Sequence, residues 1–247
     1  MNYIFGEDIF LLTGHPIAVG SRDHLSPSGS GAVNDYTDGT EFAHQLLSEF
    51  PGKRSLIDLG TATGSVPFTM RQAGMASVGL EGSDAAKERG LGAWQAMPGV
   101  VHTCDLGKPF RIVDAAGAPV TFDFVTSWDV LEHIPEPDIR QFFDNIAGLM
   151  HSESILILEF SLAYNPADGY HQLWEGWEGG GDHPGDWDAR DAWLRGLVAR
   201  HFVIDDALRT QRDWDYCRPT PTERQCSHDS NQPEFPFSRP LWWLRKN

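Results

Sequence analysis

Short apolar runs alternate with helical patterns along the middle of the chain, and this alternation predicts its secondary structure. Five runs are almost continuously apolar: Ser55–Leu59, Ala76–Leu80, Val100–Thr103, Phe122–Ser127 and Ile155–Phe160. Runs of this kind are typical of strands that are covered on both faces of a sheet. Because helical segments separate them, we predict an α/β fold with a doubly wound, mostly parallel sheet.

Helical periodicity fills the intervals between these strands. The segment Asp138–Met150 places its large apolar residues on one stripe, and a second helix is expected after Thr40, a suitable N-cap. A further helix is expected near Ala189–Arg200. His201–Asp205 and Pro240–Leu244 predict two more strands, the second of them antiparallel at the edge of the sheet.

Two segments depart from this pattern. Residues 1–39 are expected to form an N-terminal arm before a domain of residues 40–247, since Gly, Ser, Asp and Pro are frequent from residue 13 on. Residues 161–190 combine glycines and acidic residues with three tryptophans, which are Trp174, Trp177 and Trp187. A long insert in a compact domain usually serves function, so we interpret this aromatic-rich segment as a substrate-side insert or lid.

Composition narrows the class of protein. The 247 residues are 40% hydrophobic, which is enough for a full core and excludes a disordered chain. A net charge of −16 argues against an extended surface for nucleic acid or an anionic membrane. No apolar run reaches the roughly 18 residues of a membrane span, and Glu7 and Asp8 interrupt the start of the chain where a secretory signal would be apolar. Three cysteines without a CxxC pair fit a reducing compartment, so we expect a cytoplasmic protein.

A glycine-containing turn after the first predicted strand is the strongest sign of a binding site. Residues 55–65 read SLIDLGTATGS, so Asp58 lies near the end of the strand and Gly60 and Gly64 bracket a tight turn into a helix. Gly60 removes a Cβ that would block a ligand, and Gly64 lets the backbone and a ligand approach closely. The alternative is an ordinary strand–turn–helix whose glycines serve only the turn.

Glu81 follows this turn by about twenty residues, at the end of the second predicted strand in SVGLEGSD. In nucleotide-binding α/β domains, a carboxylate at this place binds the two ribose hydroxyls. The alternative is an acid that caps the next helix, ahead of Ser83 and Asp84. The spacing from the glycine turn favours the ribose interpretation.

Together these motifs resemble the class I S-adenosylmethionine-dependent methyltransferases. The first motif of that family is acid-x-Gly-x-Gly-x-Gly, which residues 58–64 follow except that Ala62 replaces the middle glycine. Asp105, in CDLGKPF, matches the acid that binds the adenine amino group, with Leu106 beside the ring. FDFVTSWDVLEHIPEP resembles the fourth strand of the family and the loop that follows it. The resemblance spans residues 40–160 and implies a seven-stranded Rossmann-like methyltransferase fold.

The resemblance also implies a cofactor, S-adenosyl-L-methionine, and a set of residues that hold it. The backbone of Trp128 and Asp129 is expected to hold the amino acid moiety of this cofactor. The complete expected set is Asp58, Gly60, Thr61, Gly64, Glu81, Gly82, Asp105, Leu106, Trp128 and Asp129. A nicotinamide oxidoreductase is disfavoured, because Ala62 would hinder the approach of a pyrophosphate.

Methyl transfer from a sulfonium requires mainly positioning, which agrees with the lack of a catalytic triad in the sequence. A hydroxyl acceptor would need a base, and the candidates are His133, His171 and His183. His133 has an alternative role in packing against the cofactor or tying its loop to the next helix. The spacing of His171, Asp182 and His183 matches no standard metal site, so no metal is expected.

The tryptophans and acids of residues 161–190 suit a polar acceptor, because sugars pack on aromatic rings and donate hydroxyl hydrogens to carboxylates. We therefore expect a methyltransferase that acts on a small polar molecule or a glycan, at a hydroxyl, without nucleic acid or membrane partners. The alternative is a non-catalytic cofactor-binding or scaffold protein of the same fold. The acceptor atom and the oligomeric state do not follow from the sequence.

Overall fold

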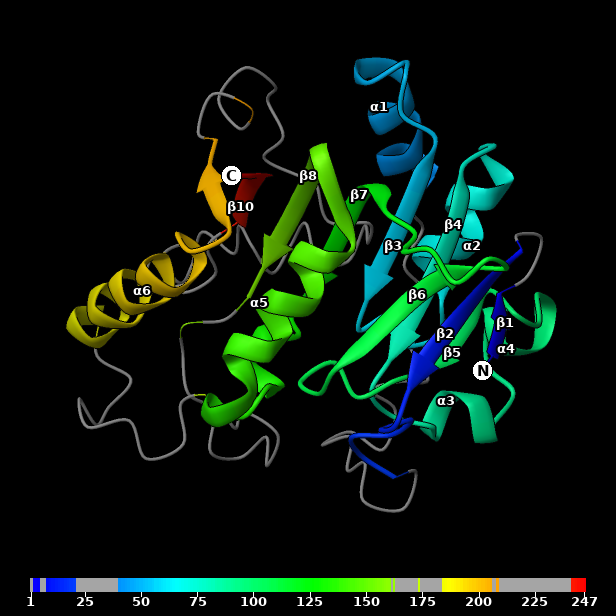
Figure 1. Cartoon of the computed structure of the whole chain (residues 1–247), viewed down its shortest axis with the longest axis horizontal. Coiled ribbons are helices and arrows are strands. Elements are labelled where there is room, and N and C mark those ends of the chain that lie inside the picture. The colour runs from blue at the N-terminus through cyan, green and yellow to red at the C-terminus, as the bar shows by residue number, and fades with distance from the viewer. Residues whose placement is uncertain are drawn as a thin grey trace, which may run out of the picture.

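Two β-sheets organise the chain (Figure 1). The computed structural model describes residues 2–4, 8–20, 40–160, 162, 173, 184–205, 208 and 241–247. The larger sheet, in the order β5-β4-β3-β7-β8-β10-β9, consists of β3 (Ser55–Leu59), β4 (Ala76–Glu81), β5 (Val101–Thr103), β7 (Phe122–Trp128), β8 (Met150–Glu159), β9 (Phe202–Ile204) and β10 (Leu241–Lys246). The smaller sheet, in the order β1-β2-β6, consists of β1 (Asn2–Ile4), β2 (Ile9–Thr13) and β6 (Phe110–Asp114). The helices are α1 (Thr40–Glu49), α2 (Ser65–Gln72), α3 (Ala85–Glu88), α4 (Ala93–Ala96), α5 (Ile139–Gly148) and α6 (Pro184–Val198), with 3₁₀ turns η2 (Leu131–His133) and η3 (Glu136–Asp138).

The larger sheet is parallel except for one strand. β3 pairs in parallel with β4 and β7, β4 with β5, and β7 with β8, whereas β10 is antiparallel to both β8 and β9. The carboxyl ends of β3, β4, β5, β7 and β8 therefore meet along one edge of the sheet. This arrangement confirms the predicted α/β fold with a mostly parallel, seven-stranded sheet.

The place of β10 differs from the prediction. This strand is antiparallel as expected, but it lies between β8 and β9 rather than at the edge. Trp242, Trp243 and Leu244 are buried, so the strand is covered on both faces, as is typical of a strand inside a sheet. β9 is short and carries the exposed Val203, which suits an edge strand better.

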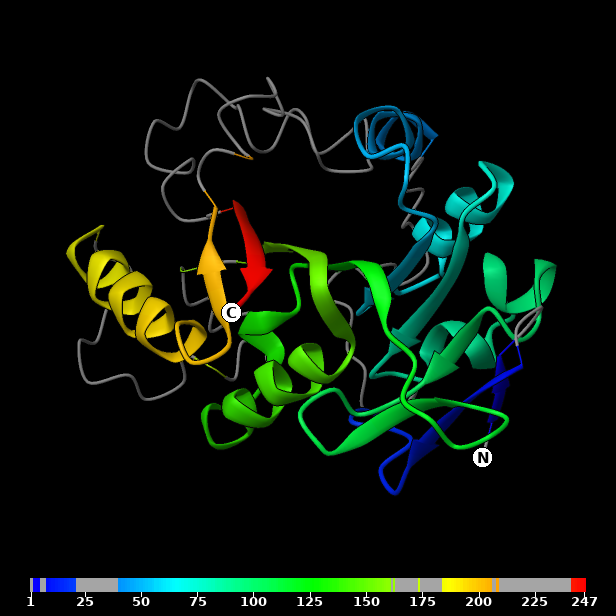
Figure 2. The ribbon, with the colours of Figure 1, turned by 45° about the horizontal axis from the view of Figure 1, so that its top comes forward.

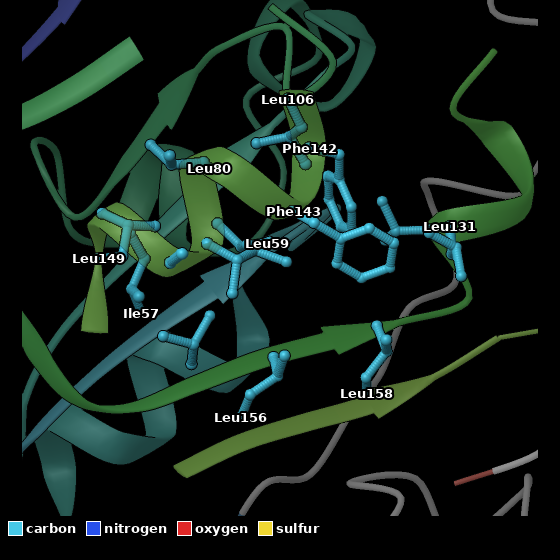
Figure 3. Packing of buried hydrophobic residues seen from close by; sticks show 14 of the residues in the cluster. Ile57, Leu59, Leu80, Leu106, Leu131, Phe142, Phe143, Leu149, Leu156 and Leu158 are labelled. Carbon is cyan, nitrogen blue, oxygen red and sulfur yellow. The ribbon is translucent and has the colours of Figure 1, made fainter. Parts of the chain in front are cut away.

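Helices cover both faces of the larger sheet. Alternate residues of β3, β8 and β10 enter one of two apolar clusters, as the two-residue period of a strand requires. On one face, Phe142 and Phe143 of α5 pack with Ile57 and Leu156 (Figure 3). On the other face lie α1 and α2, and the turned view shows α1 and α5 on opposite sides of the strands (Figure 2).

The element boundaries differ from the sequence predictions mainly around α5 and α1. The helix predicted over Asp138–Met150 spans Ile139–Gly148, and β8 starts at Met150 rather than Ile155. The first part of β8 is polar and pairs irregularly with β7, so an apolar pattern does not reveal it. Thr40 is the first residue of α1 itself, not the N-cap before it.

The smaller sheet takes two of its three strands from residues 1–39, the segment predicted to form an N-terminal arm. β2 pairs with β6 from Ile9 opposite Asp114 to Thr13 opposite Phe110, and β1 pairs with β2. The side chains of Leu11 and Phe110 enter the same apolar cluster as α5. β2 and β6 are short, and they lie about a hundred residues apart in the sequence. The local sequence of each strand therefore does not indicate its partner.

The expected lid of residues 161–190 falls largely outside the described residues. Its last part is helical, because α6 begins at Pro184 and not near Ala189 as predicted. Trp187 lies within this helix, while Trp174 and Trp177 lie outside the described residues. The division into an arm and a domain of residues 40–247 stays a prediction.

Candidate functional site

The turn between β3 and α2 contains the predicted glycine motif. Asp58 is buried in β3, and its Oδ1 accepts a hydrogen bond of 2.6 Å from the hydroxyl of Thr126 in β7. This contact joins the carboxyl ends of two neighbouring strands. Thr61, also buried, packs over Gly79 of β4, where a Cβ would come within 2.6 Å of its methyl group.

Both glycines of the turn have backbone angles that favour glycine, with φ of +76° at Gly60 and +79° at Gly64. A Cβ at Gly60 would lie 2.0 Å from a methyl of Val130, in the loop after β7. A Cβ at Gly64 would lie 2.4 Å from Val101 and 2.8 Å from Ala93. The packing of the protein itself therefore requires these two glycines, in addition to any ligand that approaches the turn.

Ala62, which replaces the middle glycine, has a left-handed backbone with φ of +48°. A left-handed residue with a side chain costs about 1–2 kcal/mol. Two hydrogen bonds hold the residue in this conformation: its N–H donates to Glu81 Oε2 at 2.6 Å, and its carbonyl accepts from Trp94 Nε1 at 3.0 Å. The turn thus keeps its shape without the middle glycine.

Glu81 connects the turn to the end of β4. Besides the bond from Ala62, its Oε1 accepts a hydrogen bond of 2.9 Å from the Ser83 N–H. At the start of α3, the Ala85 N–H donates a hydrogen bond to the hydroxyl of Ser83 and not to Glu81. The Glu81 side chain is half-buried, and both of its carboxylate oxygens accept backbone hydrogen bonds.

Asp105 lies beside Glu81, since it follows β5 and Thr103 of that strand is in register with Glu81. Its Oδ1 accepts a hydrogen bond of 3.0 Å from the Gly107 N–H, and its own N–H donates to the carbonyl of His15 at 2.9 Å. The side chain of Asp105 is half-buried, whereas Leu106 is buried in the core. The structure thus brings the two predicted adenosine-binding acids to neighbouring strand ends.

The loop after β7 begins with Trp128 and Asp129. Asp129 has φ of +52°, and its N–H donates to the carbonyl of Glu159 at 3.1 Å. The Trp128 ring packs edge-on against Phe42 of α1, with centroids 5.6 Å apart. Half-buried carboxylates thus stand at or just after the ends of β4, β5 and β7, at the same edge as the glycine turn. They suit a ligand that presents hydroxyl, amino and ammonium groups.

The comparison with protein families identifies the chain. Residues 36–202, more than half of the sequence, match the family described as "Methyltransferase domain". The chain belongs to this family. It is an S-adenosylmethionine-dependent methyltransferase, with S-adenosylmethionine as its methyl donor. A comparison with curated proteins gives no match.

Several solved structures are similar to this methyltransferase. One is the PH0226 protein from Pyrococcus horikoshii OT3, with a TM-score of 0.47 and 16% identity over 73% of this chain and 89% of that one. Another is the mitomycin 7-O-methyltransferase MmcR, with a TM-score of 0.48 and 15% identity over 90% of this chain and 56% of that one. A third is CalS10, an amino pentose methyltransferase from Micromonospora echinaspora, with a TM-score of 0.38 and 22% identity over 54% of both chains. The methyltransferase spans about half the length of the last two proteins.

Of the three candidate bases of the methyltransferase, the structure describes only His133. His133 is half-buried at the end of η2, where its N–H donates to the carbonyl of Val130 at 2.9 Å. Val130 is the residue that packs on Gly60, so His133 lies in the loop that covers the glycine turn. His171 and His183 lie outside the described residues.

Glu159 is a residue of the edge that the sequence analysis did not single out. It ends β8, is buried, lies in register with Trp128, and accepts the Asp129 N–H through its carbonyl. The signal was available in the run ILILEF, where an acid ends an apolar strand as Glu81 does. Glu159 therefore helps to shape the loop after β7.

The described residues form neither a metal-binding cluster nor a membrane-spanning helix. In the part of the chain that the structure describes, no three His, Cys, Asp or Glu side chains are grouped so that they could hold a metal ion. His171, Asp182 and His183 lie outside that part, so the expectation of no metal stays a prediction. No helix among the described residues is long and apolar enough to cross a membrane.

Proposed function

We propose that this methyltransferase acts on a small polar molecule or a carbohydrate, at a hydroxyl group. The observation that carries the proposal is the position of Leu162 and Leu173, the two described residues of 161–183. β8 ends at the carboxyl edge of the sheet. Just after it, the carbonyl of the buried Leu162 accepts a hydrogen bond from the side chain of Arg190 in α6. Leu173, also buried, donates its N–H to the carbonyl of Glu132 at 3.0 Å, beside His133. These two described residues therefore lie near the edge that carries the glycine turn.

The residues at this edge fit the donors of S-adenosylmethionine, which supplies an activated methyl group on a positively charged sulfur when bound. Glu81 would accept hydrogen bonds from the ribose hydroxyls, and Asp105 from the adenine amino group. Trp128 and Asp129 would hold the amino acid moiety. The remaining members of this proposed site form its floor and turn: Asp58, Gly60, Thr61, Gly64, Gly82 and Leu106.

His133 is the proposed base that takes the proton from the acceptor hydroxyl, with His171 and His183 as alternatives. A neutral imidazole accepts a proton near physiological pH. Its loop packs on the glycine turn through Val130, so the residue lies near the proposed methyl donor. Replacing His133 with Asn should lower kcat by about a hundredfold or more and leave cofactor affinity unchanged.

The proposal is tested with S-adenosylmethionine that carries a labelled methyl group, offered with a panel of sugars, amino sugars and small polyols. Each amino sugar is paired with the sugar that has a hydroxyl in place of the amine. Labelling of the hydroxyl member supports the proposal. Labelling of only the amine member would show N-methylation, and labelling of RNA or protein would exclude a small acceptor.

We also propose that the protein works in the cytoplasm. Cys104 is a free, buried thiol, and burial raises its pKa to about 12, so it stays protonated and suits no redox role. The absence of a CxxC pair in the sequence agrees with a reducing compartment. Fractionation of the source cells, with detection of the full chain, tests this location.

A further inference from the structure

A segment before the matched family region lies across the proposed adenosine end of the site. We call residues 14–20 the strap. The strap leaves β2 at Thr13, whose hydroxyl accepts the His15 N–H at 3.0 Å. The carbonyl of His15 then accepts the N–H of Asp105 at 2.9 Å. The family match starts at residue 36, so the strap lies before the matched region.

The second anchor of the strap is the residue after Glu81. The N–H groups of Ala18 and Val19 both donate to the carbonyl of Gly82, at 2.8 and 3.0 Å, and Val19 forms a parallel bridge with Ser83. Ala18 also lies within van der Waals reach of Gly82, where an added Cβ would be 3.5 Å from its own. The strap therefore runs from the end of β5 to the end of β4, and Figure 1 shows the segment after β2 at the lower ends of these strands.

Ile17 is the notable side chain between the two anchors. It is 41% exposed, and among the described residues only Val203 is another large apolar side chain classed as exposed. The proline before it restricts the backbone, and the hydrogen bonds on both sides hold the segment in place. An apolar side chain on a fixed segment gains free energy when a ligand removes its surface from water.

We propose that the strap forms one wall of the adenosine subsite and that Ile17 packs against the nucleoside. The inference rests on the proposed roles of Glu81 and Asp105, because the strap is bonded to the backbone of Asp105 and of Gly82, next to Glu81. The strap also has a positioning role in this proposal, because its hydrogen bonds hold the backbone next to Glu81 and at Asp105 in place.

The test compares Ile17→Ala and Ile17→Leu with Val203→Ala, which truncates the other exposed large apolar side chain among the described residues, in β9. Calorimetry measures the affinity of each variant for S-adenosylhomocysteine and for 5′-methylthioadenosine, which keeps the adenosine half but lacks the amino acid moiety. We expect Ile17→Ala to weaken both ligands by about five- to tenfold. Ile17→Leu and Val203→Ala should stay within about twofold of the wild type.

Two further measurements decide between the alternatives. The melting temperature of the ligand-free Ile17→Ala variant should equal that of the wild type, and a fall in melting temperature would show that Ile17 packs the fold instead. If Ile17→Ala binds both ligands with wild-type affinity, the proposal that Ile17 packs against the nucleoside is wrong. Glu81→Ala serves as the reference variant. If both Glu81→Ala and Ile17→Ala bind the ligands normally, the proposed placement of the cofactor is wrong. If Glu81→Ala loses affinity and Ile17→Ala does not, only the inference about the strap fails.

Discussion

At the scale of single residues, Glu81 combines a structural and a proposed binding role. Glu81→Ala should reduce affinity for S-adenosylhomocysteine by about 1.5–3 kcal/mol, since hydrogen bonds to a charged group are lost. It should also destabilise the fold, because the N–H of the left-handed Ala62 loses its acceptor. Calorimetry and urea unfolding measure the two effects.

Glu88→Ala is the matched control for this prediction, because it removes the same charge from an exposed site in α3. Glu88→Ala should change neither the affinity for S-adenosylhomocysteine nor the free energy of unfolding. Wild-type affinity in Glu81→Ala, together with a lower unfolding free energy, would leave Glu81 with the structural role only.

At the scale of elements, the glycine turn and the loop after β7 pack directly on each other. Gly60→Ala should lower the free energy of unfolding by more than about 3 kcal/mol, because φ is +76° and the new Cβ would meet Val130 at 2.0 Å. In a Val130→Ala background the same change should cost less, because the clash is relieved and only the backbone strain stays. Equal losses in both backgrounds, measured by urea unfolding, would contradict this contact.

The amino ends of β3, β7 and β8 are joined by Asp123. Burial opposes its ionisation, but hydrogen bonds from the N–H groups of Arg54 and Ser55 and from the Ser55 hydroxyl outweigh burial and hold the pKa of Asp123 below its ordinary value. A carboxyl with a lowered pKa in the folded state contributes stability that is present above its unfolded pKa, near 4, and disappears as the pH falls through the folded value.

Asp123→Asn should therefore lower the free energy of unfolding at pH 6, and the difference from the wild type should narrow below about pH 4. Urea unfolding across this pH range measures the difference. Asp114→Asn, at the last residue of β6, is a control at another carboxylate that accepts backbone hydrogen bonds. A difference that stays constant with pH would show that Asp123 acts through its shape rather than its charge.

At the scale of the whole molecule, residues 161–190 should close the acceptor side without touching the adenosine half. Replacing Trp174 and Trp177 together with Ala should lower turnover and leave cofactor affinity nearly unchanged, because a lid excludes water from the transfer. Steady-state kinetics and calorimetry separate these effects. If melting temperature and cofactor affinity fall together, the two rings pack the fold and the lid interpretation is wrong.

The sequence alone determined the parallel strands, α5 and the family. Buried strands are continuously apolar, an amphipathic helix repeats every 3.6 residues, and the glycine motif is contiguous, so each signal lies within a short window. Asp58, the glycine turn, Glu81 and Asp105 could be found in this way, and their strand ends do meet at one edge.

Only the tertiary structure decided which distant segments meet. The pairing of β2 with β6, the position of β10 inside the sheet, the bonds of the strap and the packing of Val130 on Gly60 all join residues far apart in the chain. Such contacts depend on strand register and on shape complementarity between side chains, and neither leaves a periodic trace in a single sequence. For this reason the sequence indicates that Gly60 is needed, whereas the fold shows that a valine seventy residues away is what excludes its Cβ.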